Sequence, residues 1–141
     1  DDTDSHIDTL ARFCDEHTIA YVKCEDERDE HFEALAAMEK QLMGFVDNNG
    51  NPYKFIALPM AKEVHDQNGE RLPATYANFL ILNGAVLMPF YNDKETDELA
   101  RRQLQQAFPN REVVGIECSA LICQHGSLHC VTMQYPEGFI K

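Results

Sequence analysis

Two blocks of apolar and polar residues follow one another along the chain, and both have the same order of elements. In the first block, short apolar runs at residues 7–13 and 18–24 are separated by a polar stretch, which predicts two strands. Apolar residues at helical spacing over residues 32–42 then predict a helix that ends near Gly44. A turn-rich segment leads to a strand at residues 53–58.

The second block repeats this order. Apolar runs at residues 76–82 and 85–91 meet at Asn83-Gly84, a dipeptide typical of β-hairpins. A helix follows, and the next strand is predicted at residues 112–116. The helix is expected to be capped by Asn92 or Asp93 and to pack through Leu99, Ala100, Leu104, Ala107 and Phe108.

The order strand, strand, helix, strand therefore occurs twice, and a third unit is expected over residues 121–133. Each such unit buries its apolar face against its neighbours. A chain of 141 residues with 44% hydrophobic residues is long enough for one globular domain. The sequence thus predicts a modular α/β fold, without yet indicating any chemistry.

Charge narrows the classes of partner. The net charge of -12, from 24 acidic against 12 basic residues, argues against nucleic acid or an anionic membrane surface. It favours a small cationic ligand, although acidic surfaces also serve solubility. No apolar run is long enough to span a bilayer, and no leader of basic and then apolar residues is present. Five cysteines without a CxxC pair favour free thiols in a reducing compartment, by default the cytoplasm.

Residues 3–8 combine a histidine with several carboxylates. If Ile7 faces the core of a strand, His6 and Asp8 share the opposite face, because side chains alternate with a period of two. A histidine beside a carboxylate suits general acid and base chemistry on a cation, and Asp4 is a second binding candidate. An exposed polar edge strand without a function is the alternative.

A cysteine near a glycine marks residues 126–132. Cys130 would be a thiol nucleophile if a histidine from elsewhere in the chain lowers its pKa. A small buried residue in an apolar strand is the alternative, and composition alone favours it. Cys123, His125, His129 and Cys130 match no usual zinc spacing, so no metal is expected. The other histidines are expected to be solvated, namely His17, His31 and His65.

Five segments in order resemble agmatine deiminases and bacterial peptidylarginine deiminases. They are DDTDSHIDTLARF at residues 1–13, GERLPATYANF at 69–79, NGAVLMP at 83–89, FPNREVVGI at 108–116 and GSLHCVTMQ at 126–134. The likeness spans nearly the whole chain, and several motifs in one order are far more specific than any single motif.

This resemblance implies a pentein propeller, in which five ββαβ-type units surround a central pocket. The chain would hold about two units and part of a third. Residues 1–141 would then be the C-terminal portion of a deiminase catalytic domain whose N-terminal half is absent. The isolated chain is expected to fold at least in part, to lack useful turnover, and to expose apolar faces through which it could form a homo-oligomer.

The resemblance also implies a reaction without a cofactor. The substrate guanidinium would be bound by Asp8, with Asp4 as a further ligand. The Cys130 thiolate would attack the guanidinium carbon, and His6 would protonate the departing ammonia, which leaves a covalent thiouronium. His6 would then take a proton from water, which hydrolyses the intermediate to a ureido product.

Agmatine is the first candidate substrate, giving N-carbamoylputrescine and ammonia in polyamine biosynthesis, and peptidyl-arginine giving citrulline is the alternative. Two departures from the family bear on this choice. Ser5 stands where the family usually has glycine, and Gln124-His125-Gly126 replaces a glycine-rich run, so the shape of the pocket is expected to differ. A non-catalytic relative that still binds guanidinium is a hypothesis from another class.

Overall fold

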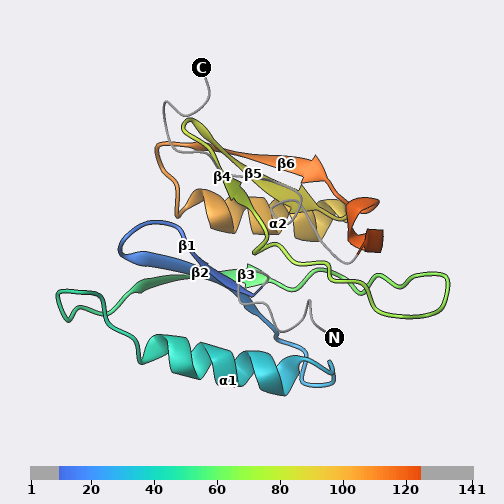
Figure 1. Cartoon of the computed structure of the whole chain (residues 1–141), viewed down its shortest axis with the longest axis horizontal. Coiled ribbons are helices and arrows are strands. Elements are labelled where there is room, and N and C mark those ends of the chain that lie inside the picture. The colour runs from blue at the N-terminus through green and yellow to red at the C-terminus, as the bar shows by residue number, and fades with distance from the viewer. Residues whose placement is uncertain (1–9, 125–141) are drawn as a thin grey trace.

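The protein's computed structural model describes residues 10–124, with side chains described as far as Ile122. Two three-stranded sheets follow one another, each with a helix between its second and third strands (Figure 1). The first unit contains β1 (Ala11–Phe13), β2 (Thr18–Lys23), α1 (Phe32–Met43) and β3 (Lys54–Pro59). The second unit contains β4 (Leu80–Ile81), β5 (Ala85–Phe90), α2 (Lys94–Gln105) and β6 (Glu112–Glu117), and is followed by the 3-10 helix η3 (Leu121–Gln124).

Both sheets have the same mixed topology. The first two strands of each sheet are antiparallel, and the second and third are parallel, with the helix as the crossover between them. The register also corresponds, because Thr18 pairs with Lys54 at the start of one parallel pair and Ala85 pairs with Glu112 at the start of the other. The predicted order of elements and the mixed α/β class are therefore confirmed for two units, and the closed five-unit propeller stays a prediction.

The elements stack as alternating layers, in the order α1, first sheet, α2, second sheet (Figure 1). Side chains of β2 alternate between the two faces of its sheet, since Ala20 belongs to the core around α2 and Ile19 and Tyr21 pack with Leu42 of α1. Because helices cover both faces, every residue of β2 except the last is buried.

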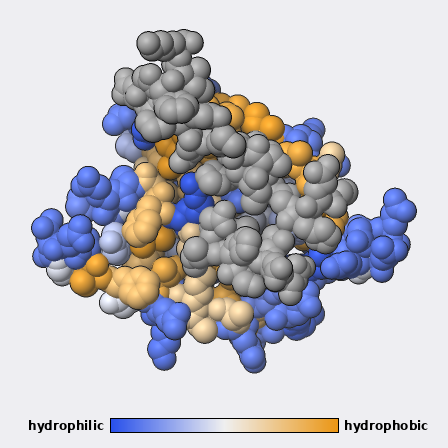
Figure 2. Space-filling view, in the orientation of Figure 1, coloured by the Kyte–Doolittle hydropathy of each residue, from blue (hydrophilic) through white to orange (hydrophobic). Residues whose placement is uncertain are grey.

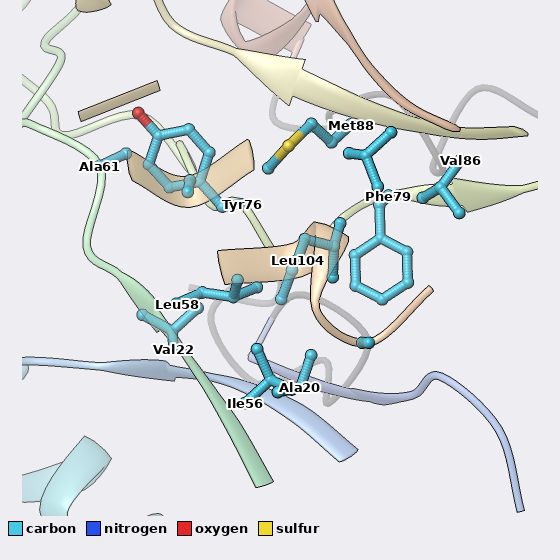
Figure 3. Packing of buried hydrophobic residues seen from close by; sticks show 14 of the residues in the cluster. Ala20, Val22, Ile56, Leu58, Ala61, Tyr76, Phe79, Val86, Met88 and Leu104 are labelled. Carbon is cyan, nitrogen blue, oxygen red and sulfur yellow. The ribbon is translucent and has the colours of Figure 1, made fainter. Parts of the chain in front are cut away.

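Leu104 of α2 lies at the centre of the larger core. Figure 3 shows it between Ile56 and Leu58 of the first sheet and Val86 and Met88 of the second. Leu58, Val86, Met88 and Leu104 have no exposed surface. The two units thus share one core, and α2 holds the sheets together.

The first strand of the second unit is shorter than predicted. β4 covers Leu80–Ile81, whereas a strand was expected over residues 76–82. The Tyr91 hydroxyl accepts a hydrogen bond from the Thr75 N–H at 3.1 Å and donates one to the Thr75 carbonyl at 2.8 Å. The Ala77 N–H donates to the Thr75 hydroxyl at 3.2 Å. These bonds to side chains occupy backbone groups that a strand ladder would need, so the segment is buried without being a strand.

The start of α2 differs from expectation in its chemistry. Asp93 is the N-cap residue, but its side chain makes no capping hydrogen bond, and Asn92 adopts a left-handed conformation with φ 56. The Asp97 carboxylate instead accepts a hydrogen bond from the Asp93 N–H at 3.0 Å.

The core-facing side of α2 also differs at one position. Leu99 was expected to pack against the core and is 40% exposed, whereas the next residue, Ala100, is fully buried as expected.

Two predicted segments extend beyond the described residues. The strand expected over residues 7–13 is described from Ala11 onward, and the third unit is described only through η3. Within residues 10–124, no helix is long and apolar enough to cross a membrane.

Candidate active site

The four residues predicted to carry the chemistry lie outside the described residues. His6, Asp8 and Asp4 precede Leu10, and Cys130 follows η3. The structure therefore neither brings these side chains together nor separates them, and their convergence stays a prediction. The elements next to them in the chain are described, and these define the frame of the candidate site.

The chain that carries His6 and Asp8 enters the first sheet at Leu10. The Val22 N–H donates to the Leu10 carbonyl at 2.9 Å, which holds Leu10 beside the end of β2. Since β1 runs antiparallel to β2 and β3 runs parallel to it, the start of β1 lies at the edge where β2 and β3 end. We therefore place the candidate site at this edge.

A cavity of about 280 Å³ lies at the same edge and is called the edge cavity below. Its buried lining includes the apolar Val22, Leu35 and Leu72 and one polar residue, Thr75. Its exposed lining includes the acidic Glu30 and Glu70 together with Ala34. The remaining residues around it are Leu10, His31, Met60, Arg71, Pro73 and Ala74. The cavity thus combines an apolar wall with an acidic rim.

Arg71 organises the charged side of the edge cavity. Its two terminal nitrogens contact the two oxygens of Asp29 at 3.2 and 3.3 Å. Nη1 also lies 3.2 Å from Glu30 and 3.1 Å from Glu63. Three carboxylates therefore contact a single guanidinium, and Glu70 borders the same cavity, so this side of the cavity keeps an excess of negative charge.

Asp29 and Arg71 are both ionised at neutral pH. Burial raises the pKa of the Asp29 carboxyl, but hydrogen bonds from the Arg71 guanidinium and the His31 N–H outweigh burial and lower that pKa below its ordinary value. Burial likewise lowers the pKa of Arg71, and hydrogen bonds to Asp29 and Glu30 raise it overall. The cluster thereby fastens the loop before β4 to the start of α1.

Arg12 of β1 links the first unit to the second. Its guanidinium carbon lies 4.6 Å from the centroid of the Phe79 ring, and its Nη1 donates to the Phe79 carbonyl.

Asn78, which precedes Phe79 in the chain, is completely buried. The strand registers allow the two sheets to be superposed residue by residue. Leu80 in the second sheet then corresponds to Arg12 in the first, and Asn78, two residues earlier, corresponds to Leu10.

Asn78 is a polar group that the sequence interpretation missed, because residues 76–82 were taken as an apolar strand. The available signal was a single amide within an apolar run. Since a buried amide is costly unless it is hydrogen-bonded, such a residue points to a specific role in packing or in the site.

The described cysteines contrast with the proposed nucleophile. Cys14, Cys24 and Cys118 are free and buried. Burial raises the pKa of the Cys14 thiol to about 12 and raises that of Cys118 as well. A thiol with a raised pKa stays protonated at neutral pH and is a poor nucleophile. Cys14 and Cys118 are therefore structural.

The histidines expected to be solvated are not equivalent. His17 is exposed, lies 3.2 Å from Asp47, and fits the expectation, as does the exposed His65. His31 is only half-exposed and lines the edge cavity, so the expectation is wrong for this residue. Among the side chains of residues 10–122, no group of three or more is placed to hold a metal ion.

Comparison with known proteins agrees with this architecture. Residues 1–136 match the family model described as Porphyromonas-type peptidyl-arginine deiminase. A Marinomonas sp. protein named "Putative agmatine deiminase" is 33% identical over 97% of this chain and 41% of its own length. The crystal structure named "Putative Arginine Deiminase" from Porphyromonas gingivalis is 57% identical, with a TM-score of 0.94 over 100% of this chain and 41% of that one.

A C. jejuni agmatine deiminase with a cysteine replaced by serine and substrate bound is 44% identical. Its TM-score is 0.80, over 92% of this chain and 36% of that chain. The present chain thus spans about two fifths of the length of the relatives that it matches.

Proposed function

Because the chain belongs to the Porphyromonas-type peptidyl-arginine deiminase family, we propose that it is part of an enzyme that hydrolyses a guanidinium group to a ureido group and ammonia. The observation that carries this proposal is the family match over residues 1–136, which includes His6, Asp8 and Cys130. The agmatine deiminases among the relatives support the same class of reaction.

In the proposed reaction, Asp8 and Asp4 accept hydrogen bonds from the planar guanidinium. The Cys130 thiolate forms a bond to the guanidinium carbon, while the bond from this carbon to one nitrogen breaks and His6 gives that nitrogen a proton. A bound cation beside the sulfur favours the thiolate form of Cys130. Water then attacks the carbon and passes a proton to His6, and the thiolate leaves. One imidazole can serve both steps because its pKa lies near neutrality.

Agmatine is our first choice of substrate. The substrate-bound C. jejuni relative is named an agmatine deiminase, as is the Marinomonas protein. Peptidyl-arginine is the second candidate, because the P. gingivalis structure at 57% identity is named for arginine and the matching family for peptidyl-arginine. We place the enzyme in the cytoplasm, as its free thiols favour.

The nucleophile is tested by Cys130→Ser in the full-length protein. Ammonia release from agmatine and from an arginine peptide is measured at saturating substrate. We expect turnover to fall by on the order of 10³-fold or more, because the serine hydroxyl is not ionised at neutral pH.

Cys24→Ala is the matched control. Cys24 is free and buried and directly follows β2, and we expect this variant to keep the turnover of the wild type. Undiminished activity in Cys130→Ser would refute the assignment. A wild-type protein that binds agmatine without releasing ammonia would instead identify a non-catalytic relative.

A further inference from the structure

Three Asn-Gly dipeptides lie between elements of the described structure, at Asn49-Gly50, Asn68-Gly69 and Asn83-Gly84. Asparagine followed by glycine is prone to deamidation, because the glycine nitrogen, which no side chain shields, attacks the side-chain carbonyl carbon of the asparagine. All six residues are exposed to water. The hydrogen bonds of each turn therefore decide which of the three pairs reacts first.

The first two of these turns have the same hydrogen bonds. The Gly50 N–H donates to the Asp47 carbonyl at 3.0 Å. The Gly69 N–H likewise donates to the Asp66 carbonyl at 3.1 Å. In each turn the carboxylate of the same aspartate also accepts the N–H of the asparagine, at 2.9 and 2.8 Å respectively. A glycine nitrogen that already donates a hydrogen bond must break it before it attacks, so both asparagines are protected.

The third dipeptide, Asn83-Gly84, joins β4 to β5 and lacks this protection. The hairpin is held by the Leu82 N–H, which donates to the Ala85 carbonyl at 2.8 Å. The Gly84 carbonyl accepts the Glu112 N–H at 3.4 Å. Within the described part of the chain, neither the Asn83 N–H nor the Gly84 N–H donates a hydrogen bond. The nitrogen that would attack the Asn83 side chain is therefore free to do so.

We propose that Asn83 is a site of spontaneous deamidation and the first of the three asparagines to convert in the folded protein. The Gly84 nitrogen forms a bond to the side-chain carbonyl carbon of Asn83, and the bond from that carbon to the amide nitrogen breaks. Ammonia leaves with the proton of the Gly84 N–H. Water then opens the cyclic imide at either of its carbonyl groups, which yields aspartate or isoaspartate. Water is the only co-reactant, and the reaction does not depend on the proposed function.

Deamidation at this position changes both the charge and the backbone of the hairpin. Each product adds a carboxylate, and isoaspartate also inserts a methylene group into the main chain. The carbonyl of Leu82, the residue before Asn83, accepts a hydrogen bond from the Arg111 Nε at 2.9 Å. Arg111 directly precedes β6. A modified chain therefore differs from a fresh one where β4, β5 and the start of β6 meet.

The test follows the three asparagines in the full-length protein during incubation at mildly alkaline pH. Tryptic cleavage after Lys54, Arg71 and Lys94 places the three pairs on different peptides, and mass spectrometry detects the conversion of each amide to an acid. We expect Asn83 to convert about three- to tenfold faster than the other two, since one hydrogen bond of ordinary net strength corresponds to such a factor. In urea the turns are unfolded, and this lead should disappear.

Two variants test the physical basis of this order. Gly84→Ala should slow the conversion of Asn83 several-fold, because the added methyl group hinders the attacking nitrogen. Gly84 suits this change, since its φ lies outside the left-handed region and an added Cβ would meet no atom of the described chain within 4 Å. Asp66→Ala removes the carboxylate that accepts the Asn68 and Glu70 N–H groups, which loosens that turn and should speed the conversion of Asn68 alone.

Melting temperatures show whether both variants keep the fold. Conversion of Asn49 or Asn68 before Asn83 in the native protein, or at an equal rate, would overturn the proposal. A lead of Asn83 that persists in urea would overturn it as well, because the sequence rather than the fold would then set the order. The Cys130→Ser protein should show the wild-type order, so the result holds whether or not deimination of a substrate is found.

Discussion

Asp97 is a carboxylate with only 4% of its surface exposed, in the first turns of α2. It accepts hydrogen bonds from the Tyr76 hydroxyl at 2.6 Å, the Tyr91 N–H at 3.0 Å and the Asp93 N–H at 3.0 Å. Three donors and the positive end of the helix dipole compensate for the burial of its charge. The same residue thus ties the residues just before α2, and the segment before β4, to the helix.

Tyr76→Phe tests this network. Burial, and next the hydrogen bond to Asp97, raise the pKa of Tyr76, so its hydroxyl stays a donor at neutral pH. Without that donor the buried carboxylate is less well satisfied, and we expect a loss of about 1–3 kcal/mol in the free energy of unfolding by urea. Tyr53→Phe, on a half-exposed ring tilted against that of Phe13, is the control and should stay within about 0.5 kcal/mol of wild type. Equal stabilities of the two variants would contradict the network's role.

At the scale of elements, the long connection between β3 and β4 depends on the Arg71 cluster. This connection has no strand or helix, and its Arg71 joins it to Asp29 and Glu30, which precede α1. The Arg71 and Asp29 side chains are 15% and 14% exposed, so water screens their contact only partly. The cluster therefore replaces regular secondary structure as the means of ordering one wall of the edge cavity.

Arg71→Gln should destabilise the protein in a pH-dependent manner. The pKa of Asp29 is lower in the folded than in the unfolded protein, so its contribution is present above the unfolded pKa, near 3.9, and is lost as pH falls through the folded pKa. We expect the variant to be less stable by about 1–3 kcal/mol at pH 7, and the difference to shrink below about pH 4.

Urea unfolding at pH 7 and pH 3 measures this difference. Arg101→Gln is the control, because Arg101 pairs with the exposed Glu98 on the surface of α2 and should affect stability much less. A deficit for Arg71→Gln that is equally large at both pH values would show that packing, rather than charge, accounts for it.

At the scale of the whole molecule, two units share one core and still leave apolar surface exposed. Phe13, Met43, Phe45 and Val46 are each at least 49% exposed, although all are large and apolar. Figure 2 shows apolar surface at the lower left, where α1 ends in Figure 1. Exposed apolar patches of this kind mark surfaces that bind another protein part or another chain.

The isolated 141-residue chain is expected to fold but not to turn over substrate. It spans about two fifths of the length of its relatives, and catalysis depends on preorganised geometry that we expect the remainder to complete. Circular dichroism should show its helices and strands, light scattering should show self-association, and ammonia release should stay at the background rate. Deimination of agmatine by this chain alone would contradict this expectation.

Local patterns in the sequence predicted most elements to within one or two residues of their ends. The positions of β2, α1, β3, β5 and β6 follow from apolar periodicity and turn residues, which act over a few positions. The order of motifs in the sequence likewise identified the family. These features depend on neighbours along the chain or on letters that can be compared directly.

Only the tertiary structure decided what depends on distant pairs. β4 is short because Tyr91 bonds Thr75, 16 residues away, and the buried Asp97 of α2 bonds Tyr76, 21 residues away. Arg71 meets Asp29 across 42 residues and thereby forms the rim of the edge cavity. A carboxylate or hydroxyl in the sequence shows what it can bond, but which partner it meets is determined by the packing of whole sheets and helices.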